Sequence, residues 1–330
     1  MKRSKLVKIL GVFLCILILS GIGLGVFGYD YFKRVFQNPD LAFEKRNDDI
    51  QVTLNPSNGP EQVVSFDHNV VNIALLGRDK DETQSYVQET NRGYNIDAII
   101  LLTVNKQTKN VSMMSIPRDT QVDIRKIDED GNVTKTYKGK ITDSFVQGGT
   151  TDAQRYDTFR GTISNLLTSS GITVPVDYFI SVEMDGFGAI TDSLGGVPVT
   201  LERDVPRIGK AGDSVVLNGQ EALHFVRVRK AYSDSDFSRA KNQQLYIKGM
   251  ATRIKELGAV ATATTLYNEF QDYVDTNLNL EQILALASIL VNLDVDNMNH
   301  YVLEASNIVN EQVIIDWSKA KDYLLDVMYN

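Results

Sequence analysis

Apolar residues form one long run near the N-terminus and several short runs further along the chain. The long run, Ile9 to Gly28, contains twenty residues without a charge. A helix needs about 20 apolar residues to cross a hydrocarbon core of roughly 30 Å. Four of the eight residues before this run are Lys or Arg, and basic flanks stay in the cytoplasm. The pattern therefore predicts a membrane-spanning helix that places the rest of the chain outside the cytoplasm.

A cleaved signal peptide is the alternative interpretation of this segment. The apolar region of a signal peptide is about 7 to 15 residues long and ends in small residues. The run at 9–28 is longer, and the residues that follow it, Tyr29 to Lys33, are a poor cleavage site. We therefore expect an uncleaved anchor at 9–28 after a cytoplasmic tail at 1–8. A polar stalk at 29–66, with turn signals at Asn-Pro and Asn-Gly pairs, would lead to an extracellular domain at 67–330.

Within residues 67–330, short apolar runs alternate with segments whose apolar residues recur at helical spacing. The runs at 70–76, 96–104 and 111–116 are rich in β-branched residues and fit strands buried on both faces of a sheet. Alternation over 122–140 around a central Asp-Gly-Asn predicts a hairpin. Further strands are predicted at 176–182, 197–201 and 301–304, and helices at 153–168, 187–194, 220–225, 236–257, 264–274, 280–291 and from about 311. This alternation indicates an α/β domain.

Residue composition excludes several classes of site. The single cysteine, Cys15, lies inside the predicted span, so the outer domain has no disulfide and no Cys-His zinc site. Its three histidines, His68, His224 and His300, have no partner at triad spacing. Beyond residue 30 the chain carries 30 basic and 41 acidic residues. A net charge near −11 does not attract nucleic acid, so any polyanion must bind a local basic cluster.

Arginines near residue 230 form the most informative polar pattern. An extended segment from Phe225 to Arg229 would project Arg227 and Arg229 from one face. Asp236, Arg239 and Gln243 follow at helical spacing and would share a helical face. Guanidinium groups bind phosphate oxygens two at a time. Taken alone, the spacing also fits arginines that pair with surface carboxylates.

Two aspartates occupy the ends of neighbouring predicted strands. Asp79 follows the first strand and Asp97 starts the next. Carboxylates at adjacent strand ends can share a Mg²⁺ ion, which commonly takes one or two carboxylates plus phosphate oxygens. Strand-end aspartates are also common turn formers, so this signal alone does not decide between the two roles.

The same residues belong to an ordered series of motifs between about 70 and 245. The series resembles the LytR-CpsA-Psr family, and its order is more specific than any single block. The blocks are NIALLGRD at 72–79, SIPRD at 115–119, KITDSF at 140–145 with Gly148-Gly149, Gly186-Phe187 with DSLGGV at 192–197, LNG at 217–219 with Ala222-Leu223, RVR at 227–229, and DFSR at 236–239 with Gln243-Gln244.

The resemblance implies an α/β/α domain with a central mixed sheet flanked by helices. It also implies an enzyme of mainly Gram-positive bacteria that transfers a teichoic acid or capsular glycopolymer from a polyprenyl diphosphate carrier to peptidoglycan through a phosphodiester. The polyprenyl tail would need an apolar pocket. The resemblance assigns Asp79 and Asp97 to Mg²⁺, with Mn²⁺ as an alternative, and assigns the diphosphate to Arg118, Lys140, Arg227, Arg229, Asp236, Arg239 and Gln243. Of these residues, Asp79, Arg118, Arg227 and Arg229 would be catalytic, and Asp79 is the first candidate for the general base.

One position departs from the family pattern. The family usually has an arginine two positions before the second metal aspartate, and this chain has Asn95 there. Arg78 or Arg92 could supply the charge from nearby. A non-catalytic protein that binds polyprenyl phosphate lipids or scaffolds wall assembly is therefore a second hypothesis. A membrane-bound transcriptional regulator is a third, and the acidic, outward-facing domain argues against it.

Overall fold

The structure is a computed structural model that describes residues 33–44, 49–54, 61–80, 94–228, 235–259, 262, 265–266, 270 and 272–329. The predicted span at 9–28 lies outside these residues, as do Arg92 and Arg229. Within the described ranges, no helix has both the length and the apolar character needed to cross a membrane.

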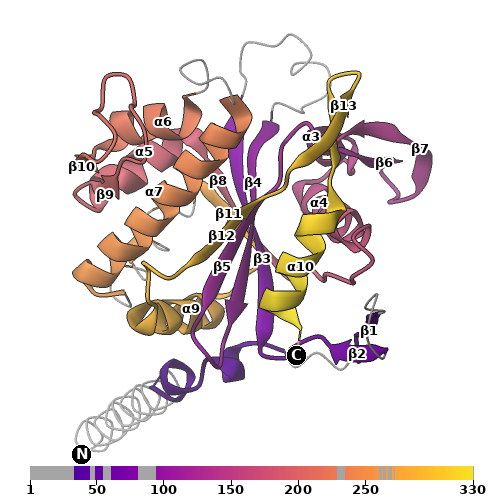
Figure 1. Ribbon diagram of the computed structural model, residues 1–330, viewed down its shortest axis with the longest axis horizontal. Coiled ribbons are helices and arrows are strands. Elements are labelled where there is room, and N and C mark those ends of the chain that lie inside the picture. The colour runs from indigo at the N-terminus through magenta and orange to yellow at the C-terminus, as the bar shows by residue number, and fades with distance from the viewer. Residues whose placement is uncertain are drawn as a thin grey trace, which may run out of the picture.

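A six-stranded mixed sheet forms the centre of the domain, with its strands in the order β11-β8-β3-β4-β5-β12 (Figure 1). The strands are β3 Val70–Lys80, β4 Tyr94–Asn105, β5 Val111–Ser115, β8 Tyr178–Glu183, β11 Val274–Thr276 and β12 Asn299–Val302. β3 pairs antiparallel with β4 and parallel with β8. The prediction of an α/β domain with a central mixed sheet is confirmed.

Helices cover both faces of this sheet. Figure 1 shows α5, α7 and α9 on one side and α4 and α10 on the other. The helices are α3 Ile141–Gln147, α4 Asp152–Thr168, α5 Met184–Ser193, α6 Gly219–Arg227, α7 Ser235–Leu257, α9 Leu280–Asn292 and α10 Trp317–Met328. Ala74 and Leu76 of β3 pack in the core with α4, whereas Ile73 and Leu75 pack on the opposite face. Burial on both faces explains why these strands are continuously apolar.

Local signals in the sequence set the ends of α4. Thr151 accepts a hydrogen bond from the backbone of Gln154, and the two residues form a capping box at the N-terminus. Gly171, just after the helix, has φ +83°, the left-handed conformation that glycine adopts without strain. The predicted helix at 153–168 is confirmed.

Four small antiparallel pairs surround the central sheet. They are β1 Gln51–Leu54 with β2 Gln62–Ser65, β6 Gln121–Ile127 with β7 Val133–Lys140, β9 Val197–Thr200 with β10 Ser214–Leu217, and β13 Ala305–Val309 with β14 Gln312–Ile315. The β6–β7 hairpin was predicted. The last pair corrects the prediction of a helix from about 311. Val313, Ile314 and Ile315 are β-branched and favour a strand, and the terminal helix α10 begins only at Trp317.

The described part of the predicted stalk packs against the domain. It includes the short 3₁₀ helix η1 Pro39–Ala42 as well as β1 and β2. Val35 and Phe43 are buried in a cluster with residues of α9 and β3. Phe66 packs edge-on against Tyr329, with ring centroids 5.6 Å apart. Apolar side chains therefore tie this segment to the base of the domain, although its polar composition suggested an irregular stalk.

Candidate active site

Asp79 and Asp97 lie on adjacent strands, near the same end of the β3–β4 pair. Asp79 pairs with Asn95 in the β3–β4 register, and the register shifts between Gly77 and Arg78. The shift makes Asp97 an extra residue in β4, which is a β-bulge. Because the bulge breaks the alternation of faces, Ile96 and Ile99 enter the same core although they are three positions apart. Periodicity in the sequence did not predict this bulge.

Each of these aspartates is paired with an arginine of the predicted phosphate site. Arg227 Nη2 lies 3.1 Å from Asp79 Oδ2, and Arg118 Nη1 pairs with Asp97 Oδ1. The four side chains are between 30% and 48% exposed, so a solute can reach them. The structure therefore brings together residues from β3, β4, α6 and the turn after β5.

Arg118 lies near several carboxylates. Its burial lowers the pKa of the guanidinium, but the hydrogen bond and charge of Asp97 and the charges of Asp119 and Asp236 outweigh burial and raise that pKa. Arginine is then cationic at any physiological pH. The influence of Asp236 also indicates that the first turn of α7 lies close to Arg118.

The segment containing Arg227 is helical, which corrects the prediction of an extended chain. Residues up to Arg227 belong to α6, which starts from a capping box made by Asn218 and Glu221. Phe225 and Val226 are buried under the last turn, so Arg227 is carried outward at the helix C-terminus. A cation is favoured there by the helix dipole. Arg229 lies outside the described residues, so its projection from the same face as Arg227 stays a prediction.

Polar residues of α7 hold the end of α6 in place. Asn242 Nδ2 donates to Phe225 O at 3.1 Å, and Gln243 Nε2 donates to Val226 O at 3.3 Å. Arg239 Nη2 lies 3.2 Å from Asp236 Oδ1, as expected for residues that share a helical face. The polar stripe predicted on α7 therefore exists, and part of it supports the backbone that carries Arg227.

Lys140 completes the cluster from the side of α3. Its Nζ lies 3.0 Å from Asp119 Oδ1 and 3.9 Å from Glu311 Oε2. Sequence analysis assigned a role to Lys140 but none to Asp119 or Glu311. Asp119 directly follows Arg118 in the SIPRD motif at 115–119, so this motif could have identified Asp119 as a candidate site residue. Glu311 lies in the turn between β13 and β14, which comes near Lys140 only through tertiary packing.

Arg78 does not supply the charge missing at position 95, so that expectation is wrong. Its guanidinium lies 2.6 Å from Glu183 and 2.6 Å from Asp275, and it donates to Tyr156 Oη at 3.0 Å. Strand alternation turns Arg78 and Asp79 to opposite faces of β3. Arg78 is therefore a buried structural cation beneath α4.

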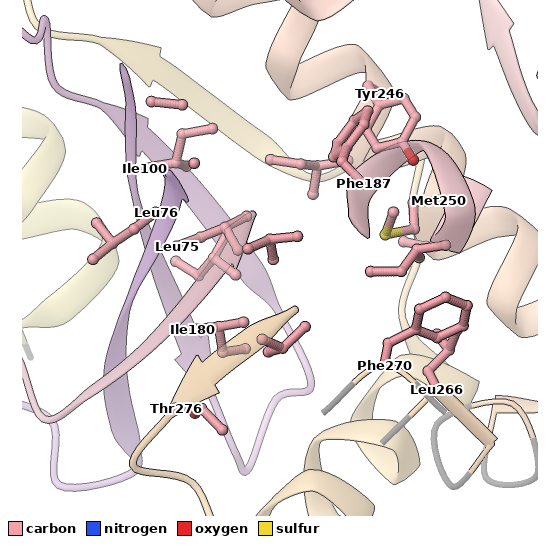
Figure 2. Close-up of a pocket in the computed structure, with 18 of the residues that line it drawn as sticks. Leu75, Leu76, Ile100, Ile180, Phe187, Tyr246, Met250, Leu266, Phe270 and Thr276 are labelled. Carbon is pink, nitrogen blue, oxygen red and sulfur yellow. The ribbon is translucent and has the colours of Figure 1, made fainter. Parts of the chain in front are cut away.

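An apolar cavity of about 640 Å³ lies between the sheet and helices α5, α7 and α9. Figure 2 shows Leu75, Ile100 and Ile180 on one wall, facing Phe187, Met250, Phe270 and other side chains across an open space. Gly77, Val226 and Gln243 also line the cavity. Val226 directly precedes Arg227, so the cavity adjoins the charged cluster of Asp79, Asp97, Arg118, Asp119, Lys140 and Arg227. Ile283, Leu286 and Leu290, which recur at helical spacing on α9, line the cavity as well.

The donor set fits a hard divalent cation better than zinc. No group of three His, Cys, Asp or Glu side chains that could hold a metal occurs in the part of the chain that the structure describes. Asp79 and Asp97 offer two carboxylates, and Mg²⁺ usually takes one or two carboxylates together with substrate phosphate oxygens. Oxygen ligands without imidazole or thiolate suit Mg²⁺ or Mn²⁺.

Comparison with known proteins points to one family. The model of the LytR_cpsA_psr family matches residues 39–326. A polyisoprenyl-teichoic acid–peptidoglycan teichoic acid transferase, TagU, from Bacillus licheniformis is 28% identical over 87% of this chain and 83% of the relative. The corresponding TagV of Bacillus subtilis is 26% identical over 86% of this chain and 67% of the relative. The crystal structure of B. subtilis TagV has the same fold, with a TM-score of 0.61 and 23% identity over 78% of this chain and 96% of that one.

Proposed function

The chain belongs to the LytR-CpsA-Psr family, and from that premise we propose that it transfers a wall glycopolymer from a polyprenyl diphosphate to peptidoglycan. Two similar proteins are named teichoic acid transferases, so a teichoic acid is the first polymer to test. One observation carries the proposal: Val226 and Gln243 line the apolar cavity, and Val226 directly precedes Arg227, which pairs with Asp79.

This arrangement matches the two halves of a lipid-linked donor. The cavity is lined almost entirely by aliphatic and aromatic side chains, which suits a prenyl chain because apolar burial is favourable at about 25 cal/mol per Å². Arg118, Lys140 and Arg227 offer forked or point-charge donors for the diphosphate. A donor bound this way would present its glycan-bearing phosphorus at Asp79 and Asp97.

The reaction requires little covalent chemistry from the protein. An acceptor hydroxyl oxygen on peptidoglycan attacks the phosphorus nearest the glycan and forms a new P–O bond. The bond from that phosphorus to the bridging oxygen breaks, and polyprenyl phosphate leaves with the electron pair. The hydroxyl proton passes to a base, for which Asp79 is the first candidate. Arginines fixed around the transferring group stabilise its charge, and each well-placed donor is worth about 2.7 to 4 kcal/mol.

Asp79 and Asp97 are also the residues proposed to hold Mg²⁺ or Mn²⁺. When bound, the cation would neutralise charge on the phosphates and orient them. The strand register supports this role, because Asp79 and the bulge residue Asp97 lie near the same end of β3 and β4.

We also propose that the segment at 9–28 anchors the protein in the cell membrane and leaves residues 67–330 outside the cell. A polyprenyl carrier stays in the bilayer, so an anchored domain meets its donor at a raised effective concentration. A reporter enzyme fused after residue 330 should be active only outside the cytoplasm. Activity in the cytoplasm would contradict this topology and revive the regulator hypothesis.

A transfer assay tests the proposed function. Full-length protein, lipid-linked teichoic acid, peptidoglycan and Mg²⁺ should yield a covalent polymer–peptidoglycan product with release of polyprenyl phosphate. Arg118→Ala and Lys140→Ala should each reduce the product strongly. Lys138→Ala is the matched control, because Lys138 lies two positions earlier on β7, is 61% exposed and pairs with Asp123. Equal product from Arg118→Ala and wild type would exclude the proposed site.

Asn95 supports a second candidate, a protein that binds the lipid without turnover. Asn95 is exposed and lies opposite Asp79, where the family usually has an arginine, and Arg78 does not compensate. Tight binding of a prenyl diphosphate with no transfer under Mg²⁺ or Mn²⁺ would favour this candidate over the enzyme.

A further inference from the structure

Asp119 lies between two cationic side chains of the proposed diphosphate site. Its Oδ1 is 3.0 Å from Lys140 Nζ, and its Oδ2 is 3.8 Å from Arg118 Nε. The side chain is 24% exposed. One carboxylate therefore faces cations from two separate elements, the turn after β5 and the start of α3.

The backbone around Asp119 is fixed from both sides. Its carbonyl accepts a hydrogen bond from Val313 N of β14 at 2.8 Å. The next carbonyl, Thr120 O, accepts from Ile141 N of α3 at 2.8 Å. Thr120 also donates through its backbone N and its hydroxyl to Pro117 O. The carboxylate therefore extends from a turn that has little freedom to move.

Two carboxylates contact different edges of the Arg118 guanidinium. Asp97 takes Nη1, and Asp119 faces Nε, which is buried and has no hydrogen-bond acceptor among the described residues. Asp97 and Asp119 therefore place negative charge beside two different nitrogens of this guanidinium. Lys140 would be repelled by Arg118 in a half-buried site, and the charge of Asp119 offsets that repulsion.

We propose that Asp119 is a positioning residue, whose carboxylate holds Arg118 and Lys140 side by side so that both cations face the diphosphate. This inference rests on the proposed function, because it assumes that a diphosphate binds there. It also predicts that removing the charge of Asp119 weakens diphosphate binding, the opposite of what charge repulsion alone would give. A carboxylate near an anion site repels the anion, so removing its charge should tighten binding unless the carboxylate positions the cations.

Glu311 provides a matched control within the same cluster. Its Oε2 lies 3.9 Å from Lys140 Nζ, but its side chain is 90% exposed. It is at the turn between β13 and β14, and water screens its charge. Glu311→Gln removes one negative charge next to Lys140 without removing a fixed contact. Its effect on diphosphate affinity should be small, or a slight gain.

Calorimetric titration of farnesyl diphosphate into the full-length protein with Mg²⁺ tests the proposal. Asp119→Asn keeps the size of the side chain and loses the charge, so we expect the Kd to rise roughly tenfold, the usual cost of a charge-assisted hydrogen bond. Glu311→Gln should stay within about twofold of wild type. In a Lys140→Met background, Asp119→Asn should cost clearly less than it does alone, because the two residues act as a unit.

The outcomes separate this inference from the proposed function. If wild type binds and Asp119→Asn binds equally or more tightly, the positioning role is wrong while the diphosphate site stands. Fully additive losses in the double variant would also overturn it. If wild type does not bind farnesyl diphosphate at all, the proposed function fails and this inference fails with it. Matching thermal melting curves for the variants would exclude misfolding as the cause of weaker binding.

Discussion

Arg227 and Asp79 are 148 positions apart in the sequence, yet Arg227 Nη2 lies 3.1 Å from Asp79 Oδ2. Arg118 pairs with Asp97 in the same way. Both carboxylates proposed for the metal are therefore held by arginines proposed for the diphosphate. A metal ion that binds the two carboxylates would release the arginines to bind the diphosphate. The metal ion and the diphosphate should therefore assist each other's binding.

The first prediction is this coupling. Mg²⁺ should raise the affinity for farnesyl diphosphate roughly tenfold, and the diphosphate should raise the affinity for Mg²⁺ by the same factor, because linkage is reciprocal. Titration calorimetry in both orders measures the two factors. Asp97→Asn should remove most of the coupling. Affinities that do not change with the other ligand would contradict it.

The second prediction concerns the effect of Arg227 on metal affinity when no diphosphate is bound. Arg227→Ala frees Asp79 from its ion pair, so Mn²⁺ should bind more tightly than in wild type, although the diphosphate binds less well. The gain should be several-fold at most, because both side chains are more than 40% exposed and such pairs are worth about 0 to 1 kcal/mol. Electron paramagnetic resonance of free Mn²⁺ reports the affinity. Weaker Mn²⁺ binding would show that Arg227 supports the metal site instead of competing for it.

The third prediction concerns the apolar cavity. Ala251→Phe places a ring among the lining residues of α7 and should exclude part of a long prenyl chain. We expect the affinity for a long-chain polyprenyl diphosphate to fall at least about tenfold, whereas inorganic diphosphate binds as before. Competition binding with the two ligands measures the difference. A parallel loss for both ligands would mean that the change disturbs the charged cluster.

The fourth prediction separates stability from binding at Arg78. Its side chain is 5% exposed and pairs with Glu183 and Asp275. Arg78→Met leaves these carboxylates without their partner and should cost about 3 kcal/mol, the lower end of the range for a broken buried pair because Asp275 remains solvated. Thermal melting should fall by roughly 6 °C or more. Diphosphate affinity measured well below the melting temperature should be unchanged, since Arg78 faces α4.

The fifth prediction restores the family pattern. Asn95 lies opposite Asp79 at the edge of the cluster, so Asn95→Arg should add a donor for the diphosphate and improve affinity several-fold or more. Asn95→Gln is the control for side-chain length without charge. If Asn95→Arg also raises the transfer rate, the native asparagine limits catalysis. A loss of affinity would mean that this copy of the family has adapted its site to asparagine.

Sequence patterns located most of the secondary structure because burial leaves a periodic signal. The continuous apolar runs of β3 to β5 and the capping signals of α4 are local properties. The patterns failed where local and tertiary preferences differ. Valine and arginine alternate over residues 226–229 as in a strand, but the capping box at Asn218 and packing against α7 make the chain up to Arg227 the end of a helix.

By itself, the sequence determined the chemical inventory: aspartates near the ends of two neighbouring strands, arginines in ordered motifs, no cysteine after Cys15, and apolar runs long enough for a sheet. Tertiary structure alone decided which of these groups meet. Asp97, the extra residue of the β4 bulge, pairs with Arg118, and the turn between β13 and β14 places Glu311 near Lys140. Arg78 and Asp79 are adjacent in sequence, but alternation along β3 points their side chains to opposite faces of the sheet. Contacts between distant residues depend on register and packing, which no local period encodes.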